Sequence, residues 1–138
     1  MTLIKIALAD DHKIFREGIL LELIKFKKVD IILVVENEQV LLDKLTGSRL
    51  PDIILMDIRM PILDGIEAPG QIRLLYPEVK IIPLTMYDDK DMIYAFQKMG
   101  ACGYLAKSTN PDEIFLAIET VFNGDFYFKI LDRRDYLL

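Results

Sequence analysis

Five residues with charged or polar side chains follow or end short apolar runs in this 138-residue chain: Asp10, Asp11, Asp57, Thr85 and Lys107. Three carboxylates placed close together should not all stay ionised without a counter-charge, because like charges disfavour each other's ionisation. Carboxylate oxygens suit a hard cation, Mg²⁺ first, which keeps some of its waters. Lys107 would add a second positive charge. If these residues meet, they could hold a cation and leave one carboxylate able to react.

The apolar runs that precede these residues have the pattern of buried parallel strands. They are short and rich in Ile and Val, and they cover Ile4–Ala9, Val29–Val35, Ile53–Met56, Val79–Leu84 and Gly103–Ala106. Segments with helical periodicity lie between them, and the last begins with Asn110 as a cap and Pro111 at the first helical position. Five strands that alternate with five helices predict a doubly wound α/β domain with helices on both faces. Ligands bind beyond the carboxyl ends of such strands, so the site should lie at that edge.

A cation, a lysine and a threonine hydroxyl around one carboxylate favour phosphoryl transfer. Catalysis of that reaction consists mainly of positioning and charge neutralisation. An aspartate can itself be the nucleophile and form an aspartyl-phosphate. Asp57 is the best candidate because it stands alone after the central strand, whereas the adjacent Asp10 and Asp11 can hold the metal.

Composition narrows the class of protein. The net charge of −5 argues against a nucleic-acid-binding surface, which would show a basic excess. Cys102 is the only cysteine, so no internal disulfide can form, and a cytoplasmic location is expected. The N-terminus lacks the pattern of a signal peptide, and no apolar run approaches membrane-spanning length.

Taken together, the motifs resemble the receiver domain of two-component response regulators. They occur in the expected order over roughly Leu3 to Asn123, with Pro61 and Gly65 after Asp57. The sequence stretches "LADDH" and "GACGYLAKSTNPDEI" are similar to those of the NarL/LuxR-type subfamily, whose members usually carry a C-terminal helix-turn-helix. The resemblance implies a flavodoxin-like receiver fold, a five-stranded parallel sheet in the order 2-1-3-4-5 with five helices. It also implies a receiver domain over residues 1–123 and, over 124–138, the start of a linker to an output domain outside this chain.

The resemblance implies a role for each site residue. Asp57 accepts a phosphoryl group from the phosphohistidine of a sensor histidine kinase, which makes the chain a phosphoacceptor signalling domain rather than an enzyme. Asp10 and Asp11 hold Mg²⁺, or another divalent cation such as Mn²⁺ or Ca²⁺, with Asp57 and the backbone carbonyl of Arg59. Asp11 is expected to be the direct ligand and Asp10 to act at least partly through water. Lys107 pairs with the phosphoryl group or, before it arrives, with Asp57.

Four residues have implied roles in switching and in phosphoryl lifetime. Thr85 hydrogen-bonds the phosphoryl group and moves toward it, and Tyr104 then turns inward. Arg59 and Tyr87 tune the hydrolysis of the aspartyl-phosphate. Activation is expected to favour a homodimer that switches transcription, with DNA bound only through the output domain and with no membrane partner.

Alternative interpretations stay open for the function and for single residues. The chain could be a free-standing receiver that signals by protein contact alone. A less favoured alternative is an aspartate-nucleophile phosphatase, which typically needs a second acid two residues after the nucleophile, where this chain has Arg59. Tyr104 fits a core aromatic as well as a switch residue. His12, the only histidine, is interpreted as a loop or first-turn residue rather than as a metal ligand.

Three features depart from the receiver pattern. Ser108 rather than proline follows Lys107, so the isomer of that peptide bond is left open. Pro69 lies inside the expected third helix and predicts a late start or a kink there. Pro83 lies in the fourth strand and predicts a missing ladder bond close to Thr85.

Overall fold

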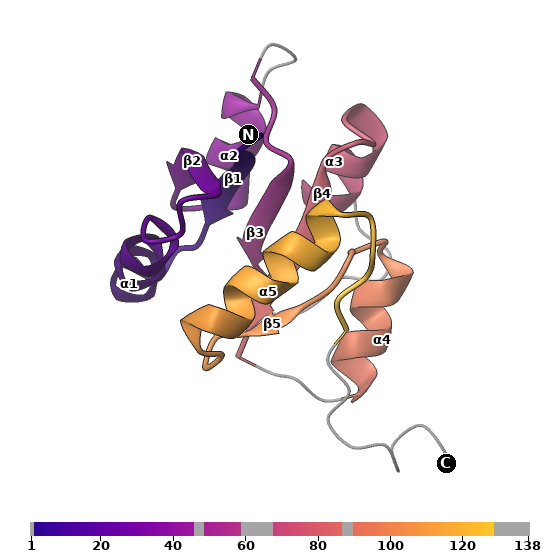
Figure 1. Ribbon diagram of the computed structural model, residues 1–138. Helices are drawn as coiled ribbons and strands as arrows, with labels where there is room; N and C mark the ends of the chain where they lie inside the picture. Colours follow the sequence, from indigo (N-terminus) through magenta and orange to yellow (C-terminus); the bar gives the residue numbers. More distant parts are fainter. Residues whose placement is uncertain (1, 46–48, 59–67, 87–89, 129–138) are drawn as a thin grey trace.

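The computed structural model describes residues 2–45, 49–58, 68–86 and 90–128 (Figure 1). Strands and helices alternate along the chain as β1 (Ile4–Ala9), α1 (Lys13–Leu23), β2 (Val29–Val35), α2 (Glu38–Lys44), β3 (Ile53–Asp57), α3 (Ala68–Leu75), β4 (Lys80–Thr85), α4 (Lys90–Lys98), β5 (Leu105–Ala106) and α5 (Pro111–Phe122). The strands pair in parallel in the order β2-β1-β3-β4-β5. The predicted fold class and strand order are therefore confirmed.

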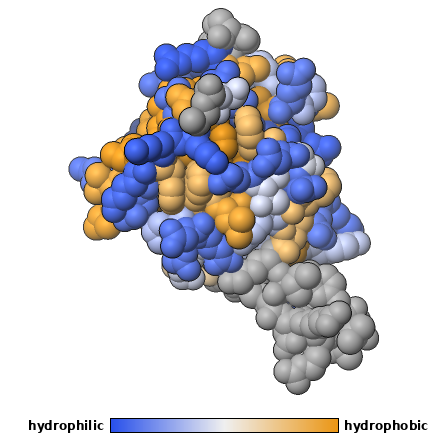
Figure 2. Space-filling model, in the orientation of Figure 1, coloured by the Kyte–Doolittle hydropathy of each residue, from blue (hydrophilic) through white to orange (hydrophobic). Residues whose placement is uncertain are grey.

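Each face of the sheet carries its own apolar cluster. One cluster joins Ile6 and Leu8 of β1 to buried residues of α1 and α5. The other joins Ala7 and Ala9 of the same strand to buried residues of α2, α3 and α4. Successive side chains of a strand point to opposite faces, so one apolar strand supplies both clusters. On the surface that carries α1 and α5, apolar side chains are interspersed with polar ones (Figure 2).

Within the described residues, no helix is long and apolar enough to cross a membrane.

The missing ladder bond of Pro83 falls on the β5 side of β4. Ile81 and Thr85 lie two residues before and two residues after Pro83. Their carbonyls accept hydrogen bonds from the segment that contains β5: the Cys102 amide donates to Ile81 at 2.9 Å, and the Lys107 amide donates to Thr85 at 2.8 Å. Residues two apart in a strand direct their backbone groups the same way, so the Pro83 nitrogen faces β5 as well. Pairing of β4 with β3 is continuous, whereas pairing with β5 covers two residues.

The two other departures from the receiver pattern have different outcomes. The peptide bond between Lys107 and Ser108 is trans, as are all peptide bonds in the described residues. The described part of α3 begins at Ala68, next to Pro69. Residues 59–67 lie outside the described residues, so the late start or kink of this helix stays a prediction.

After α5 the chain turns back and runs beside residues 102–104, which lead into β5. Gly124 makes the turn with a φ of +96°, a conformation that favours glycine. The Tyr127 amide then donates to the Cys102 carbonyl at 2.9 Å, and the Tyr104 amide donates to the Tyr127 carbonyl at 3.1 Å. We call residues 125–128 the exit segment. These residues, expected to belong to a linker, are hydrogen-bonded to the edge of the sheet.

Gly103 makes the close approach of the exit segment possible. It forms a parallel bridge with Tyr127. A Cβ at Gly103 would lie closer than 3.0 Å to the Tyr127 carbonyl oxygen, which real Cβ atoms essentially never do. The pairing therefore depends on the missing side chain.

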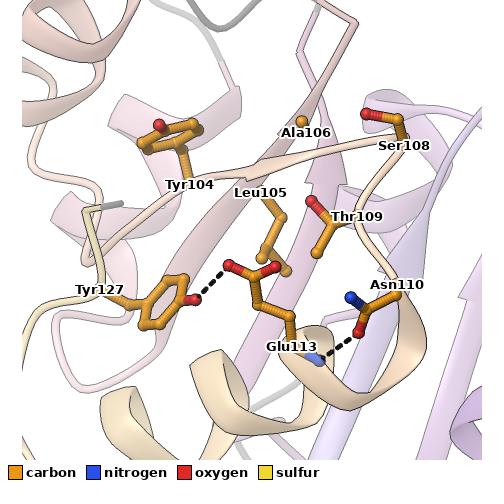
Figure 3. A pocket seen from close by; sticks show the side chains of 8 residues that line it. All are labelled: Tyr104, Leu105, Ala106, Ser108, Thr109, Asn110, Glu113 and Tyr127. Atoms are coloured by element: carbon orange, nitrogen blue, oxygen red, sulfur yellow. Dashed lines mark hydrogen bonds between the residues drawn. The ribbon is translucent and has the colours of Figure 1, made fainter. Parts of the chain in front are cut away.

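Aromatic side chains complete the attachment of the exit segment. Tyr104 is 2% exposed, and its ring centroid lies 6.4 Å from that of Phe96 and 6.2 Å from that of Phe128. The Tyr127 hydroxyl donates to Glu113 Oε1 at 2.8 Å, beside a pocket of about 250 Å³ between β5, α5 and the exit segment (Figure 3). Burial first, and then this hydrogen bond, raise the pKa of Tyr127 to about 12.

Candidate functional site

The strand order explains why the five predicted site residues lie at one edge of the sheet. Asp10 and Asp11 follow β1, Asp57 ends β3, Thr85 ends β4, and Lys107 follows β5. β1 and β3 are neighbours although β2 lies between them in sequence, so the strand order reverses at β1. The crevice at such a reversal, beyond the carboxyl ends of the strands, is where doubly wound sheets bind ligands.

The Lys107 ammonium bridges two of the three carboxylates. Its Nζ lies 3.0 Å from Asp10 Oδ2 and 3.2 Å from Asp57 Oδ1. The side chains of Lys107 and Asp57 are 9% and 8% exposed, and that of Asp10 is fully buried. Lys107 also lies over the ring of Phe15, with Nζ 4.7 Å from the centroid. Because these side chains are almost inaccessible to water, salt screens their attraction far less than it screens an ion pair at the surface.

Asp10 is fixed by the start of α1. Its Oδ1 accepts a hydrogen bond from the His12 amide at 2.7 Å, and its backbone carbonyl accepts one from Arg16 Nη1 at 2.7 Å. Its Oδ2 is buried and makes no hydrogen bond of good geometry among the described residues, and it faces the Lys107 ammonium at 3.0 Å. A buried carboxylate oxygen needs such a positive charge nearby. Such an oxygen is suited to a cation.

His12 is the one residue of the cluster that the sequence analysis set aside as a loop or first-turn residue. Its backbone is where it was expected, at the N-cap of α1, but its side chain enters the carboxylate cluster. His12 Nδ1 lies 3.4 Å from Asp10 Oδ1, 3.5 Å from Asp11 Oδ1, 3.8 Å from Asp57 Oδ2 and 2.8 Å from Lys107 Nζ. The sequence feature that could have indicated this location is the position of His12 directly after two acids at the end of a strand.

These residues fit a divalent cation. One ligand atom from each of Asp10, Asp11, His12 and Asp57 lies within 4.8 Å of the others. Asp11 is 46% exposed, so it can reach a cation that is still partly hydrated, whereas Asp10 is buried. The three carboxylates form the kind of acidic site that is typical of a magnesium-binding receiver pocket.

The remaining predicted residues divide into buried ones and ones outside the described residues. Thr85 is fully buried at the end of β4. Tyr104 is buried as well, so in this structure it already lies inward. Arg59 and Tyr87 lie outside the described residues, and their predicted roles stay predictions.

Burial is the largest influence on the pKa of the candidate nucleophile. It raises the pKa of the Asp57 carboxyl, and the nearby Asp10 charge raises it further. Lys107 opposes both by its charge and by a hydrogen bond. The net direction of the pKa is upward, so ionising Asp57 in the folded state costs stability.

We therefore expect Asp57→Asn to stabilise the fold at neutral pH in the presence of a chelator. A native-state pKa above the unfolded value means that the native state binds more protons, so the stability of the wild type falls as pH rises through that interval. The difference in the free energy of unfolding between the variant and the wild type should be absent below the pKa of Asp57 in the unfolded chain and should grow above it. A gain of about 1 kcal/mol would raise Tm by roughly 4 °C in a domain of this size.

Thermal unfolding followed by circular dichroism between pH 3.5 and 7.5 checks this expectation. Asp30→Asn is the matched control, because Asp30 is exposed on β2 and the substitution removes the same charge. If both variants gain equally at every pH, the effect comes from net charge and not from the cluster.

Comparison with known proteins agrees with this geometry. The family model for the response regulator receiver domain matches residues 6–119. The transcriptional regulatory protein LnrK of Bacillus subtilis is 38% identical over 122 residues, which cover 88% of this chain and 55% of LnrK. DegU of Brevibacillus brevis is 35% identical over 124 residues, 90% of this chain and 52% of DegU. The chain thus spans about half the length of these relatives.

Solved structures show the same fold. The signal receiver domain of the putative response regulator NarL from Mycobacterium tuberculosis superposes with a TM-score of 0.78 at 27% identity, over 90% of this chain and 99% of that one. The isolated receiver domain of RcsB from Salmonella enterica serovar Typhimurium gives a TM-score of 0.84 at 22% identity, over 98% and 99%. Receiver domains are phosphoacceptor signalling domains. The chain belongs to the response regulator receiver domain family.

Proposed function

We propose that Asp57 accepts a phosphoryl group from the phosphohistidine of a sensor histidine kinase, in a reaction that depends on a divalent cation. The observation that carries this proposal is the environment of one side chain. The Asp57 carboxylate ends β3, is almost buried, and has Oδ1 3.2 Å from the Lys107 ammonium. Family membership supports a cognate histidine kinase as the donor.

The arrangement assigns a task to each charged group. An Asp57 oxygen forms a bond to phosphorus as the phosphorus–nitrogen bond of the phosphohistidine breaks. Lys107 leaves its ion pair with Asp57 and neutralises the arriving phosphoryl oxygens. Asp10, Asp11 and Asp57 would hold Mg²⁺, with the backbone carbonyl of Arg59 as a further proposed ligand. A bound Mg²⁺ supplies positive charge that offsets the charge of the phosphoryl group.

Phosphorylation would be sensed at β4 and β5. Thr85 would hydrogen-bond the phosphoryl group from the end of β4, and Lys107 would follow it from the end of β5. The Lys107 amide donates to the Thr85 carbonyl at 2.8 Å, so a shift of either residue moves the other. Tyr104 lies three residues before Lys107 and would change its packing in response. Arg59 and Tyr87 would set the lifetime of the aspartyl-phosphate.

The output is proposed from relatives that are longer than this chain. DegU and LnrK are named as transcriptional regulatory proteins, and one solved structure shows RcsB dimers bound to DNA. We propose that residues 1–123 are the receiver, that 124–138 begin the connection to a C-terminal helix-turn-helix, and that activation favours a homodimer. A free-standing receiver that acts by protein contact alone is the alternative.

Intact mass measurement tests the proposed acceptor. The chain is incubated with acetyl phosphate and Mg²⁺, and one phosphoryl adduct that hydroxylamine removes is expected. Asp57→Asn should form none, whereas Asp30→Asn should behave as the wild type. An adduct that persists in Asp57→Asn would place the acceptor elsewhere. The absence of any adduct from the folded wild-type chain would contradict an active receiver.

A further inference from the structure

We propose that His12 is a nitrogen ligand of the divalent cation, so that this site binds cations that accept nitrogen, such as Mn²⁺, more tightly than an all-oxygen site would. The proposal deepens the proposed function, because it concerns the same cation site. It assigns a role to the one side chain of the cluster that is neither a carboxylate nor an ammonium.

The spacing of the ligand atoms supports direct coordination. Two ligands about 2.1 Å from a common cation lie about 3.0 Å apart at a right angle and about 4.2 Å apart when opposite. His12 Nδ1 lies 3.5 Å from Asp11 Oδ1, 3.8 Å from Asp57 Oδ2 and 3.4 Å from Asp10 Oδ1, the oxygen that also accepts the His12 amide hydrogen bond. All three separations fall within that interval. The four ligand atoms lie within 4.8 Å of one another, so a cation bound to Nδ1 could reach an oxygen of each acid once any pair farther apart than about 4.2 Å moves closer.

The lone pair of His12 already points into the cluster. Its Nδ1 lies 2.8 Å from Lys107 Nζ. A lysine ammonium only donates hydrogen bonds, so Nδ1 must be the acceptor in this contact. A metal would use the same lone pair, so the hydrogen bond between Lys107 and His12 would have to break when the cation binds. Lys107 then remains available for the phosphoryl group.

The start of α1 places His12 beside the carboxylates. The His12 amide donates to Asp10 Oδ1 at 2.7 Å, which holds the residue against the end of β1. His12 is the N-cap of α1, with extended backbone angles. One local hydrogen bond thereby joins its backbone to the buried carboxylate, and the contact of Nδ1 with Lys107 at 2.8 Å places the imidazole in the cluster.

The chemical consequence is a change in metal preference. Mg²⁺ favours oxygen ligands and retains its waters. Imidazole suits transition-metal cations, whose affinity for nitrogen rises from Mn²⁺ toward Cu²⁺. A site with three carboxylates and one imidazole should therefore bind Mn²⁺ with help from His12 and Mg²⁺ largely without it.

Electron spin-echo envelope modulation of bound Mn²⁺ tests the proposal directly. His12 is the only histidine, so in a chain without a histidine tag an imidazole nitrogen signal can come from no other residue. We expect this signal in the wild type and its loss in His12→Asn, which retains a good N-cap residue. Lys13→Gln, at the next position of α1, is the control and should keep the signal.

Titration calorimetry of the same variants gives the second measurement. His12→Asn should weaken Mn²⁺ binding about tenfold and Mg²⁺ binding less than twofold. Mn²⁺ that binds the wild type without a nitrogen signal, or an equal loss for both cations, would overturn the proposal. Because no phosphoryl donor is present, a positive result stands even if Asp57 proves not to be phosphorylated. A failure here, with a normal adduct on Asp57, leaves the phosphoacceptor function intact.

Discussion

Lys107→Met is expected to slow phosphorylation by acetyl phosphate about a hundredfold, the usual cost of losing one donor that stabilises developing negative charge. The same variant should bind Mg²⁺ more tightly than the wild type before any donor is added. Lys107 now neutralises Asp10 and Asp57 at 3.0 and 3.2 Å, so it competes with a divalent cation for the same charges. The two effects have opposite signs and come from one side chain.

Two measurements on each protein separate these effects. The rate of adduct formation is followed by intact mass, and Mg²⁺ affinity is measured by titration calorimetry without a phosphoryl donor. Lys98→Met is the control, because it removes the same charge from the exposed face of α4, where Lys98 lies over the ring of Tyr94. Weaker Mg²⁺ binding in Lys107→Met would mean that Lys107 organises the carboxylates rather than competing for them.

Gly103→Ala is expected to destabilise the domain by about 2 kcal/mol, a typical cost of forcing an extra methyl group into a packed site. The new Cβ would collide with the Tyr127 carbonyl, which is backbone and cannot rotate away. The domain must then lose the exit segment or strain β5. Gly18→Ala should do the reverse, because Gly18 lies inside α1 with nothing within 4 Å of an added Cβ. Alanine there should stabilise by about 0.5–1 kcal/mol.

Urea unfolding and hydrogen exchange measure the consequence. The Tyr104 and Tyr127 amides bond across the bridge, so both should exchange faster in Gly103→Ala and be unchanged in Gly18→Ala. Unchanged exchange and unchanged stability in Gly103→Ala would mean that the exit segment does not hold this position in solution.

The parts of the fold predicted from the sequence are those in which local pattern and tertiary structure agree. β1 and β2 occupy the predicted residues because each is a short run rich in Ile and Val, although only β1 is largely buried. Asn110 caps α5 as expected, accepting from the Glu113 amide at 3.0 Å, because a cap is determined within one turn. The common edge of the site residues followed from the strand ends alone.

The parts that were missed depend on contacts between distant segments. β5 was predicted over Gly103–Ala106 but has two residues, and Gly103 forms its bridge with the exit segment. No local pattern indicates that pairing, since its determinant is the absence of a side chain. The side chain of His12 was missed for a related reason. Its direction depends on the backbone angles of a cap and on Lys107, which is 95 residues away.

The attachment of the exit segment also determines how the domain would bear mechanical load. A force applied to the chain beyond residue 128 would not act first on the end of α5. It would reach the two backbone hydrogen bonds of Tyr127, which lead to Cys102 and Tyr104. From Cys102 the load would pass to β4 through its bond to Ile81. Tension from a downstream segment would therefore be felt at Tyr104 and β4, the same part of the sheet that ends in Thr85.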